Sequence, residues 1–175
     1  LMADDIHVDG RSQLLAKGSE GGGLIQVGGS WQNSDAWVRQ ATTTRVDAGA
    51  VIDASATMRG DGGEIVVWSD ISATDSITDV AGSFLALGGR QGGDGGRIET
   101  SGATLLLAPS LKIHASALNG EAGLWLQDPF NYSINSAPAG TIANSLDSGT
   151  NVTISTAVEN TSLGSSSNSG DPGNI

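Results

Sequence analysis

Cysteine is absent from the 175-residue chain. The protein therefore has no disulfide framework, no thiol nucleophile and no cysteine-ligated metal site. No apolar run reaches the roughly 18 residues that a membrane-spanning helix requires. The first ten residues, LMADDIHVDG, lack the basic segment and apolar core of a signal peptide, so we expect any export signal to lie outside this sequence.

Basic and aromatic residues are scarce. Lys and Arg number 8 against 19 Asp and Glu, which gives a net charge of −11. Binding to phosphate backbones needs a basic stripe, so nucleic acid is excluded as a partner. Aromatic residues make up 4% of the chain, and we therefore expect a thin core built from short apolar clusters. His7 and His114 are isolated and indicate no metal site.

Glycine, by contrast, is abundant, at 26 residues, without the every-third spacing of collagen. A glycine-rich turn that leads into a short apolar strand recurs as GGGLIQVGG, GDGGEIVVWS, GDGGRIETSG and GEAGLWLQDP. The last glycines before these strands are Gly23, Gly63, Gly96 and Gly123, and two positions later stand Ile25, Ile65, Ile98 and Trp125. A repeated turn-plus-strand unit predicts a stack of coils.

The segments between the glycines favour strands. VIDASA, EIVVWS and NVTIST are short and rich in β-branched residues, and no segment shows a capped helical stripe. We therefore predict an all-β fold, a parallel β-helix. Its lumen would hold the four large apolar residues in one column and Val51, Phe84 and Leu111 in another. The glycines would occupy corners that need a positive φ and no Cβ.

The repeat predicts three regions. Residues 1–135 would form the β-helical coils, 136–158 a degenerate or following coil, and 159–175 a linker rich in Ser, Asn and Gly. Pro129 removes a ladder donor and would mark a coil edge. In the degenerate coil Gly149 would be the next anchor, with Val152 one position out of register.

Three segments resemble the filamentous-haemagglutinin-like exoproteins of two-partner secretion. They are GAVIDASATMRGDGGEIVVWSD at 49–70, SFLALGGRQGGDGGRIETSG at 83–102, and LWLQDPFNYSI at 124–134, which looks like that family's "LLDP" strand. The segment TIANSLDSGTNVTIST is similar to the one that follows it there. The resemblance covers roughly residues 45–156, and it does not include the secretion domain.

This resemblance implies that the β-helix is right-handed. It also implies a non-catalytic shaft segment of a large secreted or cell-surface adhesin, haemagglutinin or biofilm component. Such proteins leave a Gram-negative-type envelope through an outer-membrane transporter, which would be the export partner. The ligand on a host cell, glycan or matrix stays open. Two alternatives also stay open: a structural filament formed by self-association, and a carbohydrate-active enzyme that would use carboxylates among Asp53, Glu64, Asp70 and Glu99.

The connections between units are the first place to look for recognition. The longest of them, 30–46, contains SWQNSDAWVRQ, in which exposed aromatic and polar side chains are typical of a binding surface. The candidates are Trp31, Asn33, Asp35, Trp37 and Arg39. The alternative is that this loop packs its tryptophans onto the shaft.

Two further kinds of site are weaker candidates. Asp61 and Asp94 occupy equivalent positions in the turns and would form an acidic ladder able to hold Ca²⁺. However, the calcium-binding nonapeptide pattern fails, because Arg97 stands where an Asp is required. Turn residues are the simpler explanation, so we expect no cofactor. Asn131, Asn151 and Asn160 lie in N-x-[ST] acceptor sequences for glycosylation.

Overall fold

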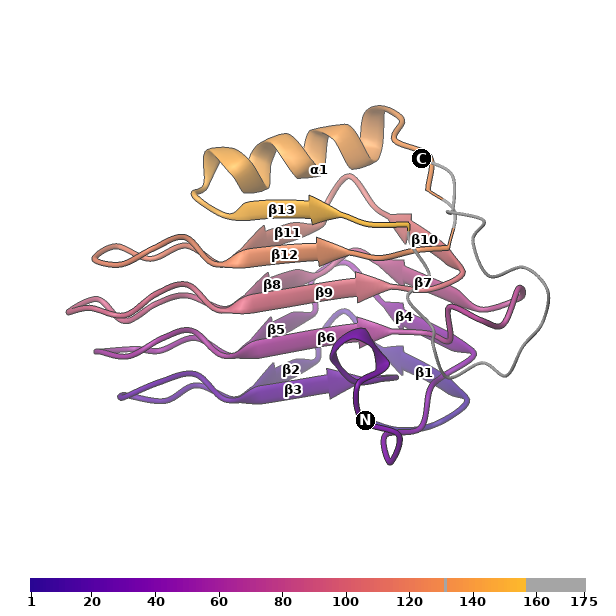
Figure 1. Cartoon of the computed structure of the whole chain (residues 1–175), viewed down its shortest axis with the longest axis horizontal. Coiled ribbons are helices and arrows are strands. Elements are labelled where there is room, and N and C mark those ends of the chain that lie inside the picture. The colour runs from indigo at the N-terminus through magenta and orange to yellow at the C-terminus, as the bar shows by residue number, and fades with distance from the viewer. Residues whose placement is uncertain (131, 157–175) are drawn as a thin grey trace.

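The computed structural model describes residues 1–130 and 132–156, and these form a right-handed parallel β-helix (Figure 1). Each of the first four coils contributes one strand to each of three parallel sheets, and the last described coil contributes one strand to sheet 3. Sheet 1 contains β1 (Asp5–Val8), β4 (Thr43–Val46), β7 (Ile77–Val80) and β10 (Thr104–Leu107). Sheet 2 contains β2 (Gln13–Leu15), β5 (Val51–Asp53), β8 (Ser83–Leu85) and β11 (Lys112–His114). Sheet 3 contains β3 (Leu24–Val27), β6 (Glu64–Trp68), β9 (Arg97–Ser101), β12 (Leu124–Gln127) and β13 (Asn151–Ile154).

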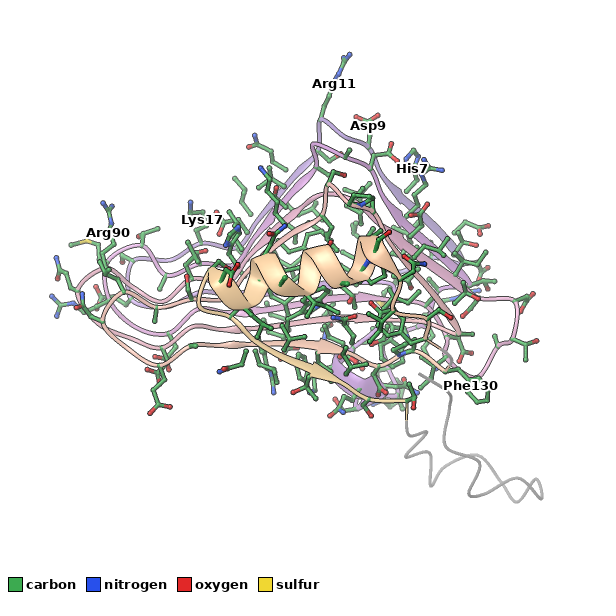
Figure 2. The ribbon with its side chains drawn as sticks, turned by 90° about the horizontal axis from the view of Figure 1, so that it is seen from above. His7, Asp9, Arg11, Lys17, Arg90 and Phe130 are labelled. Carbon is green, nitrogen blue, oxygen red and sulfur yellow. The ribbon has the colours of Figure 1, made fainter. Side chains whose placement is uncertain are left out.

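The coils have a triangular outline when seen along the stack (Figure 2). Asp9 and Arg11 lie at the corner between sheets 1 and 2, and Arg90 lies at the far end of the glycine turns, which project from the corner between sheets 2 and 3. The predicted parallel β-helix is confirmed.

One apolar column runs the length of sheet 3. Ile25 pairs with Ile65, Ile65 with Ile98, and Ile98 with Trp125. Ile65, Ile98 and Trp125 are 0% exposed. Because equivalent strands stack in register, one sequence position per coil is enough to build this column of the lumen.

The second column differs from the expectation. In sheet 2 the inward-facing partners of Phe84 are Ile52 and Ile113, whereas Val51 pairs with Ser83 and lies on the outer side. The prediction is confirmed in that Phe84 and Leu111 lie in the core, but it is wrong for Val51 and for the pairing, because it assumed a turn of constant length between sheets 2 and 3. The turns differ in length from coil to coil, and this shifts the register of sheet 2.

The glycine turns are closed by one repeated hydrogen bond. In each of the four coils the anchor glycine donates its N–H at 2.7 Å to an alanine carbonyl oxygen; the pairs are Gly23–Ala16, Gly63–Ala54, Gly96–Ala86 and Gly123–Ala115. None of these glycines has a positive φ, which occurs instead at the tips, as at Gly60 (86°). The expected positive φ is therefore wrong, whereas the expected need for a residue without a Cβ is confirmed. These glycines are required because stacked backbones approach too closely for a Cβ.

A helix that the sequence reasoning missed covers the end of the stack. α1 (Ser136–Asp147) packs against β11 and β13 in the place of a further strand of sheet 2 (Figure 1). Asn135 caps its N-terminus by accepting from the Ala137 N–H at 3.2 Å. At its C-terminus the N–H groups of Gly149 and Thr150 donate to the carbonyls of Leu146 and Ser145, which is a Schellman motif.

The apparent register slip after α1 does not exist. Gly149, with φ of 79°, ends the helix and is not a turn anchor. Val152 pairs with Trp125, so β13 extends the column of sheet 3 in register. The predicted linker, residues 159–175, lies outside the described residues.

Candidate functional site

The longest connection crosses the outer face of sheet 3. Residues 29–41, here called the covering loop, join β3 to β4 and lie in front of sheet 3 (Figure 1). The loop contains the 3₁₀ turn η1 (Trp31–Asn33). Gln32 and Asn33 have φ angles of 47° and 51°, a left-handed conformation that non-glycine residues adopt only when other contacts stabilise it.

Trp68 anchors this loop. It follows the inward-facing Val67 and so points away from the lumen, yet it is 0% exposed. Its Nε1 donates to Oε1 of Gln40 at 2.9 Å, and a Cβ placed on Gly29 would lie 2.3 Å from its ring. The loop therefore converts the outer face of β6 into a second buried surface.

Glu99 is buried under the same loop. Its Oε2 accepts from the Gln32 N–H at 2.8 Å, and its Oε1 accepts from Oγ of Ser101 at 3.1 Å. Burial raises the pKa of Glu99 to about 8 and outweighs the hydrogen bonds from Gln32 and Ser101, which act to lower the pKa; the negative charges of Asp128 and Glu64 act in the same direction as burial. Glu99, one of the carboxylates considered for catalysis, is 0% exposed.

Trp31 packs onto the shaft rather than into solvent. The guanidinium carbon of Arg97 lies 4.4 Å from the centre of its ring, and Arg97 Nε donates to Oε2 of Glu64 at 2.6 Å. A cation over an aromatic face is stabilising. The loop is thus held by an apolar contact at Trp68, a buried hydrogen bond at Glu99 and a cation–π contact at Trp31.

The other loop candidates do not converge into one pocket. Trp37 is 93% exposed, and its backbone N–H donates to Asp35 Oδ1 at 2.9 Å. Arg39 forms an ion pair with Asp4. Asn33 lies in the strained turn. The structure therefore exposes Trp37, Asp35 and Arg39 on the outside of the loop, while Trp31 packs against the sheet.

The acidic residues of the turns are engaged between coils. Asp61 Oδ1 accepts from the Asp94 N–H at 2.8 Å, and Asp94 Oδ1 accepts from the Glu121 N–H at 2.8 Å. Each carboxylate thus accepts a hydrogen bond from a backbone N–H group of the next coil. Within residues 1–130 and 132–156, no group of three or more His, Asp or Glu side chains is placed to hold a metal ion.

The carboxylates considered for catalysis are dispersed. Asp53 lies in sheet 2 with Lys17 Nζ at 3.0 Å. Burial acts to raise the pKa of Asp53, but hydrogen bonds from Ser55 and Lys17 outweigh it and leave the pKa below its ordinary value. Asp70 accepts from Ser72 in the loop after β6. Only Glu64 and Glu99 lie on the same face, and the covering loop closes over Glu99.

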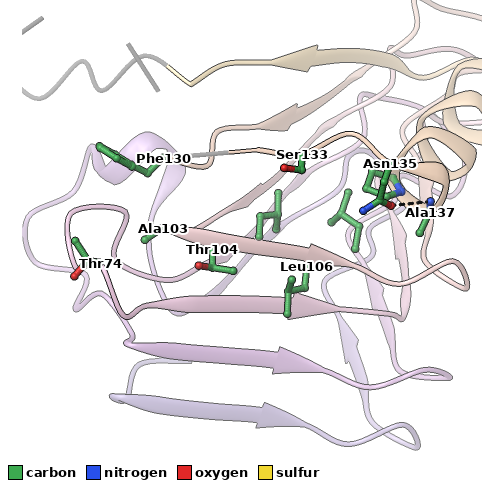
Figure 3. Close-up of a pocket in the computed structure, with 11 residues that line it drawn as sticks. Thr74, Ala103, Thr104, Leu106, Phe130, Ser133, Asn135 and Ala137 are labelled. Atoms are coloured by element: carbon green, nitrogen blue, oxygen red, sulfur yellow. Dashed lines mark hydrogen bonds between the residues drawn. The ribbon is translucent and has the colours of Figure 1, made fainter. Parts of the chain in front are cut away.

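The hollows on the surface of the described residues include one on sheet 1 and one beside sheet 3. One, of about 470 Å³, lies over β10 and is lined by Thr104, Leu106, Phe130 and Asn135 among others, with no titratable side chain (Figure 3). The other, of about 800 Å³, is a shallow groove floored by the stacked glycines and bordered by Asp61, Glu64 and Arg97. Neither contains a convergent set of catalytic groups.

Of the acceptor sequences for glycosylation, Asn151 begins β13, is exposed, and donates from Nδ2 to the Ala122 carbonyl at 3.0 Å. Asn131 and Asn160 lie outside the described residues.

Trp68, Gln40 and Glu99 are the site residues that sequence reasoning failed to connect. The one available signal was the run EIVVW, which is apolar at successive positions and so indicates burial on both faces of the strand.

In the described part of the chain, no helix has the length and apolar character needed to cross a membrane. No protein-family model matches the chain, and no curated protein is significantly similar to it.

Proposed function

We propose that the chain is a non-catalytic scaffold segment of a secreted or cell-surface adhesive protein, in which the β-helix holds the covering loop outward for binding. The observation that carries this proposal is Trp37, which is 93% exposed on a loop fixed at several points to a rigid sheet.

An exposed indole is a costly surface feature unless it is used in contacts. Tryptophan supplies a large, flat apolar area that loses little conformational entropy on binding, which explains its prevalence in binding hot spots. The strands beneath the loop are paired on both edges, as in β6, between β3 and β9. The loop therefore starts from a preorganised frame, which lowers the entropic cost of association.

The partner of this surface would be a glycan or protein on a host cell or matrix. The net charge of −11 disfavours an anionic partner and favours a neutral or basic one. Export through an outer-membrane transporter and location at a Gram-negative-type cell surface belong to the same proposal and rest on the family resemblance.

Attachment of the immobilised chain to glycan arrays and to matrix proteins tests the proposal. We expect Trp37→Ala to reduce attachment at least tenfold, as for a hot-spot residue. Leu118→Ala is the matched control, because Leu118 is 76% exposed but lies in a glycine turn away from the loop. No attachment by the wild-type chain, or equal loss in both variants, would refute an adhesive role for the loop.

A self-associating subunit is the second candidate. In the first coil Leu14 and Ile25 are only half-buried, whereas Ile52 and Ile65 in the next coil are 0% exposed. Among residues 1–130 and 132–156, no strand pairs with β1, β2 or β3 on that side. Sedimentation over a concentration range tests this. Association that Leu14→Lys abolishes supports it, and a monomer at every concentration excludes it.

A further inference from the structure

Glu99 links the covering loop to sheet 3, and the strength of this link depends on whether the Glu99 carboxyl group carries a proton. Its side chain is 0% exposed, and one oxygen accepts the Gln32 N–H at 2.8 Å across the boundary between loop and sheet. The other oxygen accepts from Ser101 at 3.1 Å, within the sheet. The contact is therefore made by a carboxyl group that the closed loop removes from water.

The charges around Glu99 do not neutralise it. Glu64 faces it from β6 and Asp128 from the segment after β12, and both are acidic. Arg97, on the same strand, makes its ion pair with Glu64. The charged side chains of the loop are Asp35, whose Oδ1 accepts the Trp37 N–H, and Arg39, which makes its ion pair with Asp4. A negative charge on Glu99 would therefore be buried among other negative charges.

We propose that the covering loop is a pH-dependent latch, closed over a protonated Glu99 and released from sheet 3 when Glu99 loses its proton. This inference rests on the proposed function, because the loop that moves is the one that presents Trp37. The left-handed residues Gln32 and Asn33 favour release, because their backbone strain is relieved once the contact is broken.

The direction of the pH dependence follows from the two states. In the closed state the pKa of Glu99 is about 8, whereas in an opened loop the hydrated carboxyl returns toward its ordinary value of 4.5. The closed state thus holds a proton that the open state releases between these values. Closure is fully stable below the lower value, weakens as the pH rises, and reaches its minimum above about 8.

Opening has local consequences that can be measured. It breaks the hydrogen bond from Gln32 to Glu99, separates Trp31 from Arg97 and exposes Trp68 to water. The strands of sheet 2 lie on another side of the stack and are not affected.

Hydrogen exchange of residues 30–41 tests the latch when it is corrected for the pH dependence of intrinsic exchange. Between roughly pH 5 and 8 we expect the open fraction of the wild-type loop to rise by up to about tenfold per pH unit, the limit for release of one proton. In Glu99→Gln, which keeps the shape without the charge, it should not change with pH. Exchange at β5 serves as the reference for global unfolding.

Glu64→Gln is the matched control. It removes a neighbouring carboxylate but leaves Glu99 able to titrate, so the pH dependence of the loop should persist. A second measurement uses the wild-type chain alone: the carboxyl carbon shift of Glu99 and the amide shift of Gln32 should titrate together near pH 8.

A flat wild-type exchange profile, or an unchanged slope in Glu99→Gln, would overturn the proposal. So would titration of Glu99 near its ordinary value. These measurements use no ligand, so a chain that fails to attach through Trp37 would refute the adhesive role without affecting this test.

Discussion

The N–H of Gly63 donates to the carbonyl oxygen of Ala54 at 2.7 Å, and the same bond closes the glycine turn in all four coils. A Cβ on Gly63 would lie 1.9 Å from the carbonyl oxygen of Gly23 in the neighbouring coil. Backbone segments therefore lie in close contact on the two sides of each turn and also between the turns of neighbouring coils. This explains why the chain needs glycine at a position where φ is ordinary.

Gly63→Ala should accordingly destabilise the fold by about 2–4 kcal/mol, since backbone atoms have to move to accommodate the methyl group. Urea denaturation followed by circular dichroism measures this. Gly140→Ala in α1 is the control, because a Cβ there meets nothing within 4 Å. It should stabilise by about 0.5–1 kcal/mol through helix propensity. Similar effects of the two changes would contradict the close approach.

Ile98 should behave as a central residue of the lumen. Ile98→Ala leaves a cavity between Ile65 and Trp125 and should cost about 2–5 kcal/mol of unfolding free energy. Ile77→Ala, at a 38% exposed position on the outer face of sheet 1, should cost less than about 1 kcal/mol. Comparable losses would place Ile98 outside the core.

Gln127 offers a stabilising change. Its side chain is 0% exposed, and neither Nε2 nor Oε1 has a hydrogen-bond partner among the described residues. Gln127→Leu should therefore raise the unfolding free energy by about 1–3 kcal/mol, because a buried amide without partners is replaced by an apolar group. A lower thermal midpoint in this variant would show that the amide is satisfied in solution.

The turn carboxylates should stabilise through hydrogen bonds rather than through a metal. Asp94→Ala removes the acceptor of the Glu121 N–H and should cost about 1 kcal/mol. Addition of a chelator, or of Ca²⁺, should leave the thermal midpoint of the wild-type chain unchanged. A large shift with either would restore the calcium ladder at Asp61 and Asp94.

The repeat predicted the architecture because one of the apolar columns can be recognised in the sequence itself. Ile25, Ile65, Ile98 and Trp125 stand at a fixed distance from their glycines, so the register of sheet 3 follows from the sequence alone. Sheet 2 could not be registered in the same way, because the turn before Ile65 differs in length from the turn before Ile98. Ile52, and not Val51, therefore faces the lumen beside Phe84.

α1 escaped prediction because its buried side carries polar residues beside Pro138 and Ile142 and so shows no continuous apolar stripe. The buried residues are Pro138, Thr141 and Ser145, and Ser145 Oγ donates to the Thr141 carbonyl at 2.9 Å. A search for a hydrophobic stripe cannot find such a helix. The Asn135 cap and Gly149 were the available signals. Likewise, the burial of Glu99 depends on a loop far away in sequence, which no local pattern encodes.

The parallel register of the strands produces the apolar columns, the hydrogen bonds between successive glycine turns and the position of the covering loop. Cysteine crosslinking measures this register directly, because the chain has no cysteine of its own. Val51→Cys combined with Ser83→Cys places two outward-facing thiols on paired residues of β5 and β8, whereas Val51→Cys with Lys112→Cys places them two strands apart. We predict rapid crosslinking by oxidation in the first pair and little in the second, because paired Cα atoms lie within the roughly 4.4–6.8 Å that a disulfide spans. Equal crosslinking in both pairs, or crosslinking only in the second, would contradict the stacked register.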